Sequence, residues 1–400
     1  MSLSVKTVGG GGGYKVGDVI PAAQLEEYRD PNSTERTLIE NLPLPSSLSS
    51  TYRSYYTYER TDGTLLCFVE ISSSIIMLYD PKTLSAIWSL SARSQQILAI
   101  DDNYLYRSYQ ISGSSAESRK RYIEKIHLDT GVVEQSTTIT STRTVNTSYD
   151  ANPSALSIDS YCDSKNYIWI DVRDLDHQTD IYYGTDYFRR IYRIRKDDLS
   201  TSVMWEVTNN KYATTLAVRW RLIAGSKDSD NIAVLEISDS TYLNIRDGDF
   251  NQVAVRNISG ISLSYQYMGP YGYNTTGGFI CDDDTKLFVM ELSRKKYFIF
   301  NLSTLETLVE KDLGTVQIKR YNPNTRQMVL YDSSTKTFSG YDLSHSQKWL
   351  LDTTQASLAY DYPVENNKKD KVYVPTYNTN TLTTIWAAPV SGYIIKEATE

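Results

Sequence analysis

The sequence predicts an all-β protein, and within that class a seven-bladed β-propeller with an extended Gly-rich N-terminal segment. One observation is the composition, with 33 tyrosines against 8 phenylalanines, because tyrosine favours strands and half-buried surfaces. Another is the apolar pattern, which alternates every second residue and almost nowhere follows the helical period. The third is a repeat of strands and polar turns from about Tyr52 to the end of the chain.

Each repeat contains an apolar-alternating strand, a polar turn, a second strand, a turn that begins with Asp or Asn, and a third strand. The seven triplets begin at Leu65, Tyr104, Tyr167, Ile232, Leu287, Met328 and Val372. These starts are 39, 63, 65, 55, 41 and 44 residues apart, and propeller blades repeat at about 40–50 residues. The long steps contain insertions at 112–120 and 174–187. A β-sandwich or a run of separate β domains is the alternative.

A fourth, short strand is predicted before most triplets. These strands are expected at Tyr55–Glu59, Ile97–Ile100, Ala155–Ile158, Leu216–Ile223 and Val316–Tyr321. Four strands in each of seven units is the pattern of a propeller. The last turn of the first six units begins with the same chemistry, at Asp80, Asp129, Asp197, Asp247, Asn301 and Asp342. An Asp or Asn at that position accepts hydrogen bonds from its own turn backbone.

Three of these turns are followed by a tryptophan at a nearly constant distance. Trp88 and Trp205 lie eight residues after Asp80 and Asp197, and Trp349 lies seven after Asp342. This spacing resembles the blades of quinoprotein-type propellers, and "MLYDPKTLSAIWSL" is the best match. The resemblance implies the architecture of the blade and carries no implication of a quinone, so no cofactor is expected.

Residues 1–50 do not fit the repeat, so the sequence predicts two parts: an N-terminal assembly segment with a linker at 1–50, and the propeller at 51–400. The segment contains the run Gly9, Gly10, Gly11, Gly12 and Gly13, followed by Tyr14. A phosphate-binding loop is disfavoured because no Ser or Thr follows Lys15. Polyglycine allows backbones to approach closely around an axis, and "LSVKTV" could add a strand to a neighbour. We therefore expect Gly9–Tyr14 to act in assembly.

The stretch Lys15-Val16-Gly17-Asp18-Val19-Ile20, placed between a glycine run and a propeller, resembles the start of tail-fibre and baseplate-associated proteins. These belong to bacteriophages and phage-tail-like particles of Gram-positive bacteria. The aromatic, Asn-Gly-bearing stretch that follows in such proteins is absent here. The resemblance implies a homo-oligomeric virion or particle component, assembled in the bacterial cytoplasm. It also implies that residues 1–50 bind other tail or baseplate proteins.

Charge and hydropathy exclude several partners. The chain has 41 basic and 48 acidic side chains, whereas a nucleic-acid surface needs a basic excess. No apolar run approaches the length that spans a bilayer, and the start lacks a secretory pattern. We therefore expect neither nucleic-acid binding nor membrane insertion. The odd count of Cys67, Cys162 and Cys281 argues against a disulfide framework and favours a reducing compartment.

No catalytic residue and no metal site is predicted. His127, His177 and His345 are too far apart in sequence to suggest zinc binding, and no Gly-x-Ser-x-Gly motif occurs. "CDDDTK" at Cys281–Lys286 has adjacent rather than alternating aspartates, so an inter-strand turn is favoured over a calcium loop. Paired carboxylates of a glycan-cleaving enzyme stay an alternative, because spacing between blades cannot be read from sequence.

Two tyrosine-rich segments are the predicted recognition surface. "DIYYGTDYF" carries Tyr182, Tyr183 and Tyr187, and "SYQYMGPYGYNTTGG" carries Tyr271 and Tyr273 among glycines. Rigid aromatic rings with a polar tip suit protein interfaces and sugar faces. We expect these five tyrosines to contact a neighbouring tail protein or a host-surface glycan. The alternatives are packing between blades, and a cytoplasmic scaffold propeller with no link to a virus.

Overall fold

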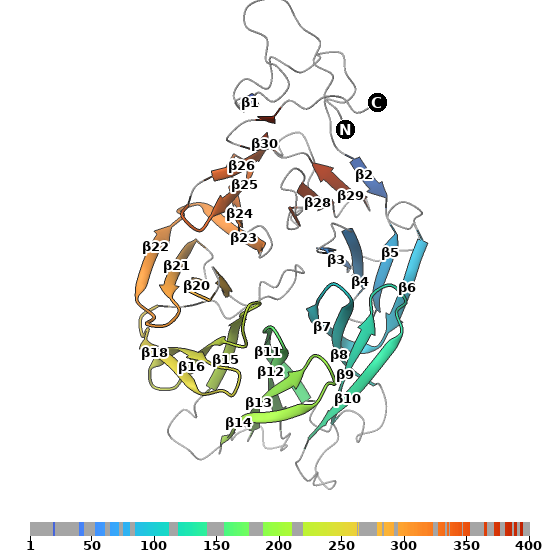
Figure 1. Ribbon diagram of the computed structural model, residues 1–400, viewed down its shortest axis with the longest axis vertical. Helices are drawn as coiled ribbons and strands as arrows, with labels where there is room; N and C mark the ends of the chain where they lie inside the picture. Colours follow the sequence, from blue (N-terminus) through green and yellow to red (C-terminus); the bar gives the residue numbers. More distant parts are fainter. Residues whose placement is uncertain are drawn as a thin grey trace, which may run out of the picture. The chain divides into compact units, whose positions relative to one another are not determined.

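The structure of the chain is a computed structural model (Figure 1). It describes residues 19–20, 40–43, 53–60, 65–71, 75–80, 85–111, 119–141, 156–175, 187–209, 219–261, 263, 278–281, 284–291, 295–322, 327–332, 334–335, 337–345, 347–352, 364–365, 372–376, 381–385, 388–389 and 393–394. The chain divides into two units, one of residues 49–314 and one of residues 1–48 with 315–400. In the described parts no helix is long and apolar enough to cross a membrane.

The unit of residues 49–314 contains five antiparallel sheets in its described residues, and each has four strands consecutive in the chain. Sheet 1 comprises β3 (Arg53–Glu59), β4 (Leu65–Ile71), β5 (Ile75–Asp80) and β6 (Ser85–Ser91). Sheet 2 comprises β7 (Arg93–Ile100), β8 (Tyr104–Gln110), β9 (Lys120–His127) and β10 (Val133–Thr140). Sheet 3 comprises β11 (Leu156–Asp163), β12 (Tyr167–Leu175), β13 (Tyr187–Arg195) and β14 (Thr201–Asn209). Sheet 4 comprises β15 (Arg219–Gly225), β16 (Ile232–Ile237), β17 (Thr241–Arg246) and β18 (Gln252–Asn257). Sheet 5 comprises β19 (Gly278–Cys281), β20 (Lys286–Met290), β21 (Lys296–Asn301) and β22 (Thr307–Asp312).

The other unit contains two more sheets and one isolated strand pair in its described residues. Sheet 6 comprises β23 (Val316–Asn322), β24 (Gln327–Asp332), β25 (Thr337–Asp342), β26 (Gln347–Asp352) and β30 (Ala388–Pro389). Sheet 7 comprises β27 (Val364–Glu365), β28 (Val372–Thr376), β29 (Thr381–Ile385) and β2 (Glu40–Pro43). The isolated pair is β1 (Val19–Ile20) with β31 (Tyr393–Ile394).

The order of strands identifies the sheets as propeller blades. In sheets 1–5 the chain runs from the first strand to the fourth as a simple meander, and the next strand starts a new sheet. Contacts between successive sheets join first strands, β7 to β11, β11 to β15 and β15 to β19. Within this unit the first strands therefore lie on the inside and the fourth strands on the outside (Figure 1). The protein is an all-β propeller.

The predicted repeat is confirmed in position. The seven predicted triplet starts fall at the first or second residue of β4, β8, β12, β16, β20, β24 and β28, which is the second strand of each sheet. The short preceding strands correspond to β3, β7, β11, β15 and β23. Of these, the predicted Leu216–Ile223 is observed as Arg219–Gly225. The first strands of sheets 5 and 7, β19 and β27, were not predicted.

One strand from the predicted N-terminal segment belongs to the last sheet. Glu40–Pro43 pairs antiparallel with Thr381–Thr384 of β29, and so supplies the fourth strand of sheet 7. The predicted boundary at residue 50 therefore divides a sheet between its two parts. The run from Gly9 to Tyr14 lies outside the described residues, so its assembly role stays a prediction.

A hydrophobic core lies between each pair of neighbouring sheets from 1 to 5. Phe68 and Leu78 of sheet 1 pack with Leu105 of sheet 2, and all three are at most 1% exposed. Sheets 4 and 5 meet through buried aliphatic and aromatic residues such as Leu243 and Phe300. Since sheets 2–4 bury both faces against their neighbours, their middle strands are apolar over consecutive residues, as in the fully buried "IWI" of β12 at Ile168–Ile170.

The tryptophans that follow the Asp turns connect one sheet to the next. The Trp88 indole N–H of β6 donates to the Leu128 carbonyl in the last turn of sheet 2, at 2.6 Å. Gly131 lies directly beneath this ring with φ of +67°, where a Cβ would be 2.5 Å from Trp88 Cγ. Trp205 of sheet 3 packs edge-to-face on Trp220 of sheet 4, with ring centroids 5.8 Å apart. The side chain of Trp349 lies outside the described ones.

The predicted chemistry of the Asp and Asn turns is confirmed at two of the six predicted positions, Asp247 and Asn301. Asp247 Oδ1 accepts from the backbone N–H groups of Asp249 and Asn251, and Asn301 Oδ1 accepts from Ser303 and Thr304. In sheet 3 the neighbouring Asp198, rather than Asp197, accepts from the Ser200 N–H.

Every outer strand from β6 to β26 carries a β-bulge at the same place. The unpaired residue is Ile87, Glu134, Met204, Val253, Leu308 or Lys348, each just before the residue that resumes the ladder. Bulges twist an edge strand and hinder pairing with other chains. Ile87, Val253 and Leu308 are also 47–48% exposed, so this device protects an edge that carries apolar side chains.

We predict that Gly225→Ala lowers the free energy of unfolding by about 1–3 kcal/mol, the usual cost of overpacking a close contact. A Cβ at Gly225 of β15 would lie 2.3 Å from the Asp163 carbonyl oxygen of β11 and 2.6 Å from its carbonyl carbon. Both atoms are backbone, so the first strands of sheets 3 and 4 would have to separate. Denaturant unfolding measures the loss, and an unchanged midpoint would contradict this close approach.

Candidate functional site

Two ends of sheets 1–5 can be told apart by their connections. At one end, called the turn end, lie the turns between the first and second strands and between the third and fourth. Ser164 and Asn166 of sheet 3 donate to Asp230 of sheet 4 at this end, at 2.8–3.0 Å. Ser226 and Asn231 of sheet 4 donate in the same way to Asp284 of sheet 5. The turn ends of these sheets therefore face the same way, and the opposite end is called the loop end.

These contacts also give Asp284, within the predicted "CDDDTK" turn, a structural role. Its two carboxylate oxygens accept hydrogen bonds from Ser226 and Asn231 of the preceding sheet. Among the residues that the structure describes, no group of three or more His, Cys, Asp or Glu side chains is placed to hold a metal ion. Asp282 and Asp283 lie outside the described residues.

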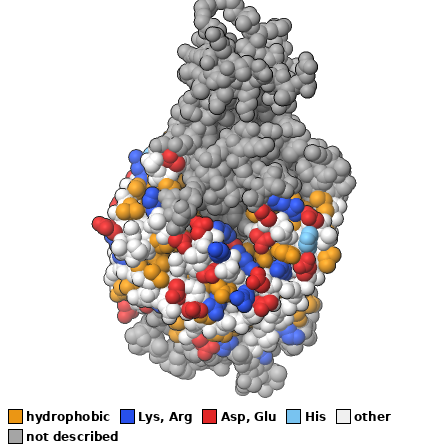
Figure 2. All heavy atoms as spheres, viewed as in Figure 1, with side chains coloured by type: hydrophobic (Ala, Val, Ile, Leu, Met, Phe, Trp, Pro, Cys, Tyr) orange, Lys and Arg blue, Asp and Glu red, His pale blue; other side chains and the backbone are white. Residues whose placement is uncertain are grey.

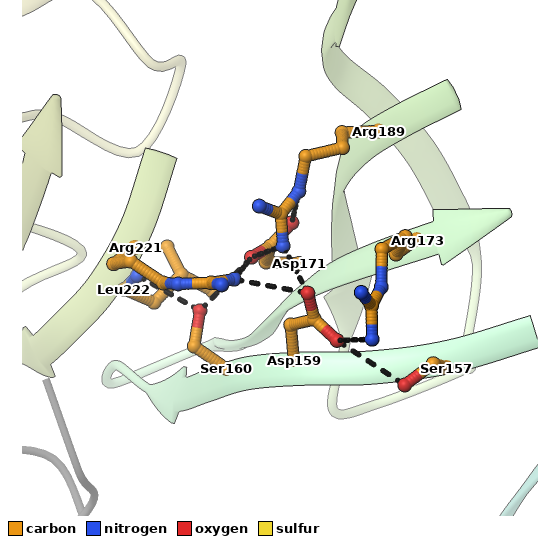
Figure 3. A network of polar contacts seen from close by, with 8 residues as sticks. All are labelled: Ser157, Asp159, Ser160, Asp171, Arg173, Arg189, Arg221 and Leu222. Atoms are coloured by element: carbon orange, nitrogen blue, oxygen red, sulfur yellow. Dashed lines mark hydrogen bonds and ion pairs between the residues drawn. The ribbon is translucent and has the colours of Figure 1, made fainter. Parts of the chain in front are cut away.

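A group of five charged side chains, called the charged cluster, joins sheets 3 and 4 (Figure 3). Its members are Asp159 of β11, Asp171 and Arg173 of β12, Arg189 of β13 and Arg221 of β15. Arg173 lies two residues before the loop end of β12, and Arg189 and Arg221 are the third residues of strands that begin at the loop end. The cluster therefore lies toward the loop end.

Within the cluster each aspartate pairs with more than one arginine, and Arg189 and Arg221 each pair with both aspartates. Arg189 binds Asp171 with two donors, Nε to Oδ1 at 3.3 Å and Nη2 to Oδ2 at 3.0 Å, and Nη2 also reaches Asp159. Arg221 Nη1 from sheet 4 binds Asp171 at 2.9 Å and Asp159 at 3.1 Å. Arg173 Nη2 binds the other oxygen of Asp159 at 3.2 Å.

Hydroxyl groups complete the shell around the two carboxylates. Ser160 Oγ donates to Asp171 at 3.3 Å and accepts from the Leu222 backbone N–H at 3.0 Å, so one side chain links both sheets. Ser157 Oγ donates to Asp159 at 3.2 Å. Asp171 is fully buried and Arg189 is 2% exposed.

A β-bulge explains how Asp159 reaches this site. The register between β11 and β12 shifts between Ile158 and Ser160, which leaves Asp159 as the extra residue. Bulges turn a side chain out of its regular direction and occur often beside functional sites. The first strands of sheets 2 and 4 carry a bulge at the matching place, with Leu98 and Ile223 as the extra residues.

Comparison of register shows that sheet 3 alone places charges at these positions among sheets 2, 3 and 4. The positions that correspond to Asp159, Asp171 and Arg189 hold Leu98, Tyr106 and Ile123 in sheet 2, and Ile223, Ala233 and Leu243 in sheet 4. All six of these residues are at most 2% exposed. Three core positions of the repeat are thus charged in one blade.

The free energy cost of burying these three charges indicates that they have a role besides stabilising the fold. A buried ion pair loses hydration that its Coulomb attraction only partly restores, and apolar replacements of similar volume are often as stable or more so. Two neighbouring blades fill the same positions with such apolar side chains. When residues differ from the repeat at core positions without adding stability, a functional role is the usual reason. The charged cluster is therefore our candidate functional site.

The two carboxylates differ from a pair that performs acid–base chemistry. Both Asp159 and Asp171 are bound by more than one guanidinium group, so neither faces a substrate position alone. With every member ionised, two aspartates meet three arginines, and the cluster carries one excess positive charge. The cluster can hold the two blades in register.

We predict that the carboxyl group of Asp171 titrates near pH 6. Burial raises its pKa from the ordinary 3.8 to about 6, although Arg189 and Arg221 oppose this rise. The folded protein then binds a proton that the unfolded chain releases, so the contribution of Asp171 to the unfolding free energy falls as pH rises from about 4 to about 6. Carbon-detected NMR of the side-chain carboxyls measures this directly. Asp198 is the control, because hydrogen bonds from Ser200 lower its pKa, and titration of both groups below pH 4 would contradict the prediction.

Other buried polar groups in the described residues act within the scaffold. In sheet 2 the Arg107 guanidinium binds Glu124 at 2.7 Å and Gln95 at 2.6 Å, all three at most 8% exposed. Cys162 and Cys281 are buried thiols, Cys281 Sγ donates to the Lys286 carbonyl at 3.6 Å, and burial raises the pKa of the Cys162 thiol. His127 is the last residue of β9 and lies against the Tyr104 ring, His345 lies in the turn after β25 against the Tyr341 ring, and His177 lies outside the described residues.

The tyrosines predicted as recognition residues are only partly placed. Tyr187 begins β13, opposite Leu175 and Asn209, and its side chain is not among those described. Tyr182, Tyr183, Tyr271 and Tyr273 lie outside the described residues. The strand bounds do show where their segments attach, because β12 ends and β13 begins at the loop end. The segment of Tyr271 and Tyr273 likewise connects β18 to β19 at the loop end.

The sequence prediction missed the charged cluster entirely. A signal for it was present, because Asp159 and Asp171 interrupt the apolar strands "LSID" and "YIWID". We read aspartates as markers of turns, and the register shift at Asp159 could not be seen without the pairing of β11 with β12.

Figure 2 shows acidic and basic side chains interspersed over the described part of this face, with apolar side chains scattered between them. This mixture of signs fits the near balance of charges in the sequence, and the described part of the face shown carries no basic stripe of the kind that nucleic acid needs.

No protein family matches the sequence of this chain, and no curated protein matches it either. Among solved structures, the chain is similar to the β-propeller domain of Cps50 (Swd1) from Myceliophteria thermophila, with 8% identity, a TM-score of 0.48, and coverage of 84% of this chain and 96% of that one. It is also similar to BamB from Moraxella catarrhalis, with 11% identity, a TM-score of 0.40, and coverage of 82% and 81%. The Dos1 propeller has 10% identity, a TM-score of 0.45, and coverage of 82% of both chains. The class of the protein, a β-propeller, rests on the strand order and register described above.

Proposed function

We propose that this protein is a non-enzymatic binding component of a phage tail or tail-like particle, anchored by its N-terminus and contacting its partner through the loop end. The observation that supports it is the distribution of connections in residues 49–314. At the turn end, successive strands are joined by three to six residues. At the loop end, five connections, at 111–119, 141–155, 176–186, 210–218 and 258–277, have nine to twenty residues, and the other four within this unit have one to five. Long connections on a rigid scaffold are where propellers place recognition.

The charged cluster supports a binding role over a catalytic one. It is the strongest departure from the blade repeat in sheets 2–4, and it lies toward the loop end. Its carboxylates are committed to arginines, which leaves no general acid and base pair there for glycan hydrolysis. The tail assignment itself comes from the resemblance of Lys15–Ile20 and from the order of glycine run and propeller.

Two experiments test the proposal. Deletion of residues 1–18 keeps the strand pair of Val19–Ile20 with β31, so the propeller should melt as the full chain does. Immunogold microscopy of particles released by the producing cells should show the full chain on tails and the truncated chain absent. The proposal would be contradicted if the full chain gave no label on tails, or if the truncated chain were incorporated as the full chain is.

The second experiment separates binding from cleavage. The purified chain is incubated with Gram-positive cell-wall material, and sedimentation and released reducing ends are measured together. Saturable co-sedimentation without release supports a binding component. Release of reducing ends would favour the glycan-cleaving alternative, and no co-sedimentation would leave a neighbouring tail protein as the partner of the loop end.

A further inference from the structure

We propose that the outer strand of sheet 5, β22, is an acceptor edge for residues 3–8 of a second copy of this chain. This stretch, "LSVKTV", is called the donor segment, and it would add to sheet 5 as an antiparallel fifth strand. This inference rests on the proposed function, because it names the partner of the predicted N-terminal assembly segment. The donor segment lies outside the described residues, whereas β22 is described along its whole length.

The backbone of β22 has polar groups that face away from its own sheet. The Leu313 N–H donates to the Lys295 carbonyl at 2.7 Å, which directs Leu313 toward β21. Backbone directions alternate along an antiparallel pair, so Glu310 and Asp312 direct their N–H and C=O groups away from β21. Among the described strands, none pairs with this side of β22. An added antiparallel strand would form hydrogen bonds with these four backbone groups.

The bulge at Leu308 leaves room for this pairing. It lies at the start of β22, and residues 309–312 pair with β21 in regular register. In sheet 6 the outer strand β26 has its bulge at Lys348 and still pairs with β30 through Trp349 and Leu350, directly after the bulge. An outer strand of this repeat can therefore accept a short strand on the residues that follow its bulge.

The outer side chains of β22 differ in charge from those of the other outer strands of sheets 1–5. Leu308 at the bulge is 47% exposed, and the alternate residues that follow it, Glu310 and Asp312, are exposed carboxylates. After the bulge, β6, β10 and β18 have no carboxylate, and β14 has Glu206 alone. Glu310 is paired with Lys296 of β21, and its side chain is still 53% exposed, so it can meet a second ammonium group.

Charge and hydropathy select the donor segment and its direction. Lys6 is the one charged residue of "LSVKTV", and an antiparallel register that sets Lys6 opposite Glu310 also sets Val8 beside Leu308. Cross-strand pairs of opposite charge and of apolar side chains stabilise a sheet. A parallel strand with the same Lys6–Glu310 pair would instead set Val8 opposite Asp312. We therefore expect the antiparallel direction.

The donor segment and the acceptor edge are different surfaces, so each copy can both give a strand and receive one. Contacts of this heterologous kind produce a ring if they close and a chain of copies if they do not. Either arrangement makes self-association of the full chain the property to measure.

The test is sedimentation velocity of the full chain over a range of concentrations, with the charge reversed on each side of the pair. We expect the full chain to self-associate as its concentration rises. Lys6→Glu and Glu310→Lys should each weaken self-association by about 3-fold or more, because an attractive cross-strand pair becomes a like-charged one. The double variant, and an equimolar mixture of the two single variants, should associate as the full chain does, since each donor segment again meets an edge of opposite charge.

Glu206→Lys is the matched control. Glu206 is 47% exposed on the outer strand β14 and is paired with Arg190, as Glu310 is paired with Lys296. Its reversal should leave self-association unchanged. A full chain that stays monomeric at every concentration, equal weakening by Glu206→Lys, or no recovery in the double variant would overturn the inference.

Cysteine cross-linking identifies the source of the added strand. A chain with Lys6→Cys is mixed with a chain that carries Glu310→Cys, and the joined peptides are detected by mass spectrometry after air oxidation. We expect this cross-link between the two chains, and none when Glu206→Cys replaces Glu310→Cys. A cross-link that forms only when both cysteines are in one chain would overturn the role of a second copy. If self-association fails while immunogold microscopy still labels tails, the proposed function stands and only this inference fails.

Discussion

Replacing Arg189 with methionine should lower the free energy of unfolding by about 3–5 kcal/mol, the usual cost of removing one partner from a buried ion pair. Arg189 donates to both oxygens of Asp171, which is fully buried. Methionine would fill much of the volume of the arginine stem. The loss would therefore come from a carboxylate that keeps Arg221 and loses its two-donor partner.

Guanidinium-induced unfolding of the full chain and the variant measures this difference. The control is Arg195→Met on the same strand, which removes an exposed guanidinium and should change the free energy by less than about 1 kcal/mol. Equal losses in the two variants would contradict a special role for the buried pair.

A second variant separates the cost of an orphaned charge from the value of the cluster. It carries Asp159→Ile, Asp171→Ala, Arg189→Leu and Arg221→Met, where the first three are the residues of sheet 4 at the matching positions. Because the only member of the cluster left is Arg173, whose side chain is 37% exposed, no buried charge is left unpaired, and stability should return to within about 1 kcal/mol of the native chain or exceed it. A loss as large as that of Arg189→Met would show that the cluster stabilises the fold in itself.

The other large effect is expected at the loop end. Replacing Tyr183, Tyr187, Tyr271 and Tyr273 by serine should weaken binding to the partner by about 30-fold or more, because aromatic anchors are commonly worth about 2 kcal/mol or more. The two segments that carry these tyrosines connect β12 to β13 and β18 to β19, both at the end where the long connections gather. Co-sedimentation with cell-wall material or with tail proteins measures the change.

Two comparisons control for packing. Phenylalanine at the same four positions keeps the rings and removes the hydroxyls, so it should retain much of the affinity if ring contact dominates. The melting temperature of the serine variant should stay close to that of the native chain. Normal binding together with a much lower melting temperature would mean that the tyrosines pack between blades and that recognition lies elsewhere.

The architecture could be predicted because each strand and turn has a signal in the few residues that form it. The alternation around Leu65, Tyr104 or Ile232 marks a strand, and the Asp or Asn that follows marks a turn, so position along the repeat can be read residue by residue. The regular spacing of Trp88 from Asp80 was visible in the same way, although its hydrogen bond to the next sheet was not. Such signals need no knowledge of which strands pair.

The charged cluster was not predictable by the same means, because it depends on pairing between distant residues. Asp159 and Arg221 are 62 residues apart and meet only when sheets 3 and 4 are packed. The strand at Glu40–Pro43 was missed for a similar reason, since its partner at Thr381–Thr384 lies at the other end of the sequence. A four-residue stretch with a proline carries little strand signal by itself.

That strand has a mechanical consequence. If residues before Glu40 are attached to a larger particle, any pull on the body of the protein passes along the backbone of β2 into sheet 7. Only four residues of β2 pair with β29, and Pro43 contributes no N–H donor to them. A pulling force would therefore separate β2 from β29 before it separates longer pairs of strands such as β12 and β13, which pair over nine residues. The backbone N–H and C=O groups of β29 that had paired with β2 would then be unpaired and able to accept a strand from another chain. Force on the N-terminal segment would therefore expose a surface for strand addition.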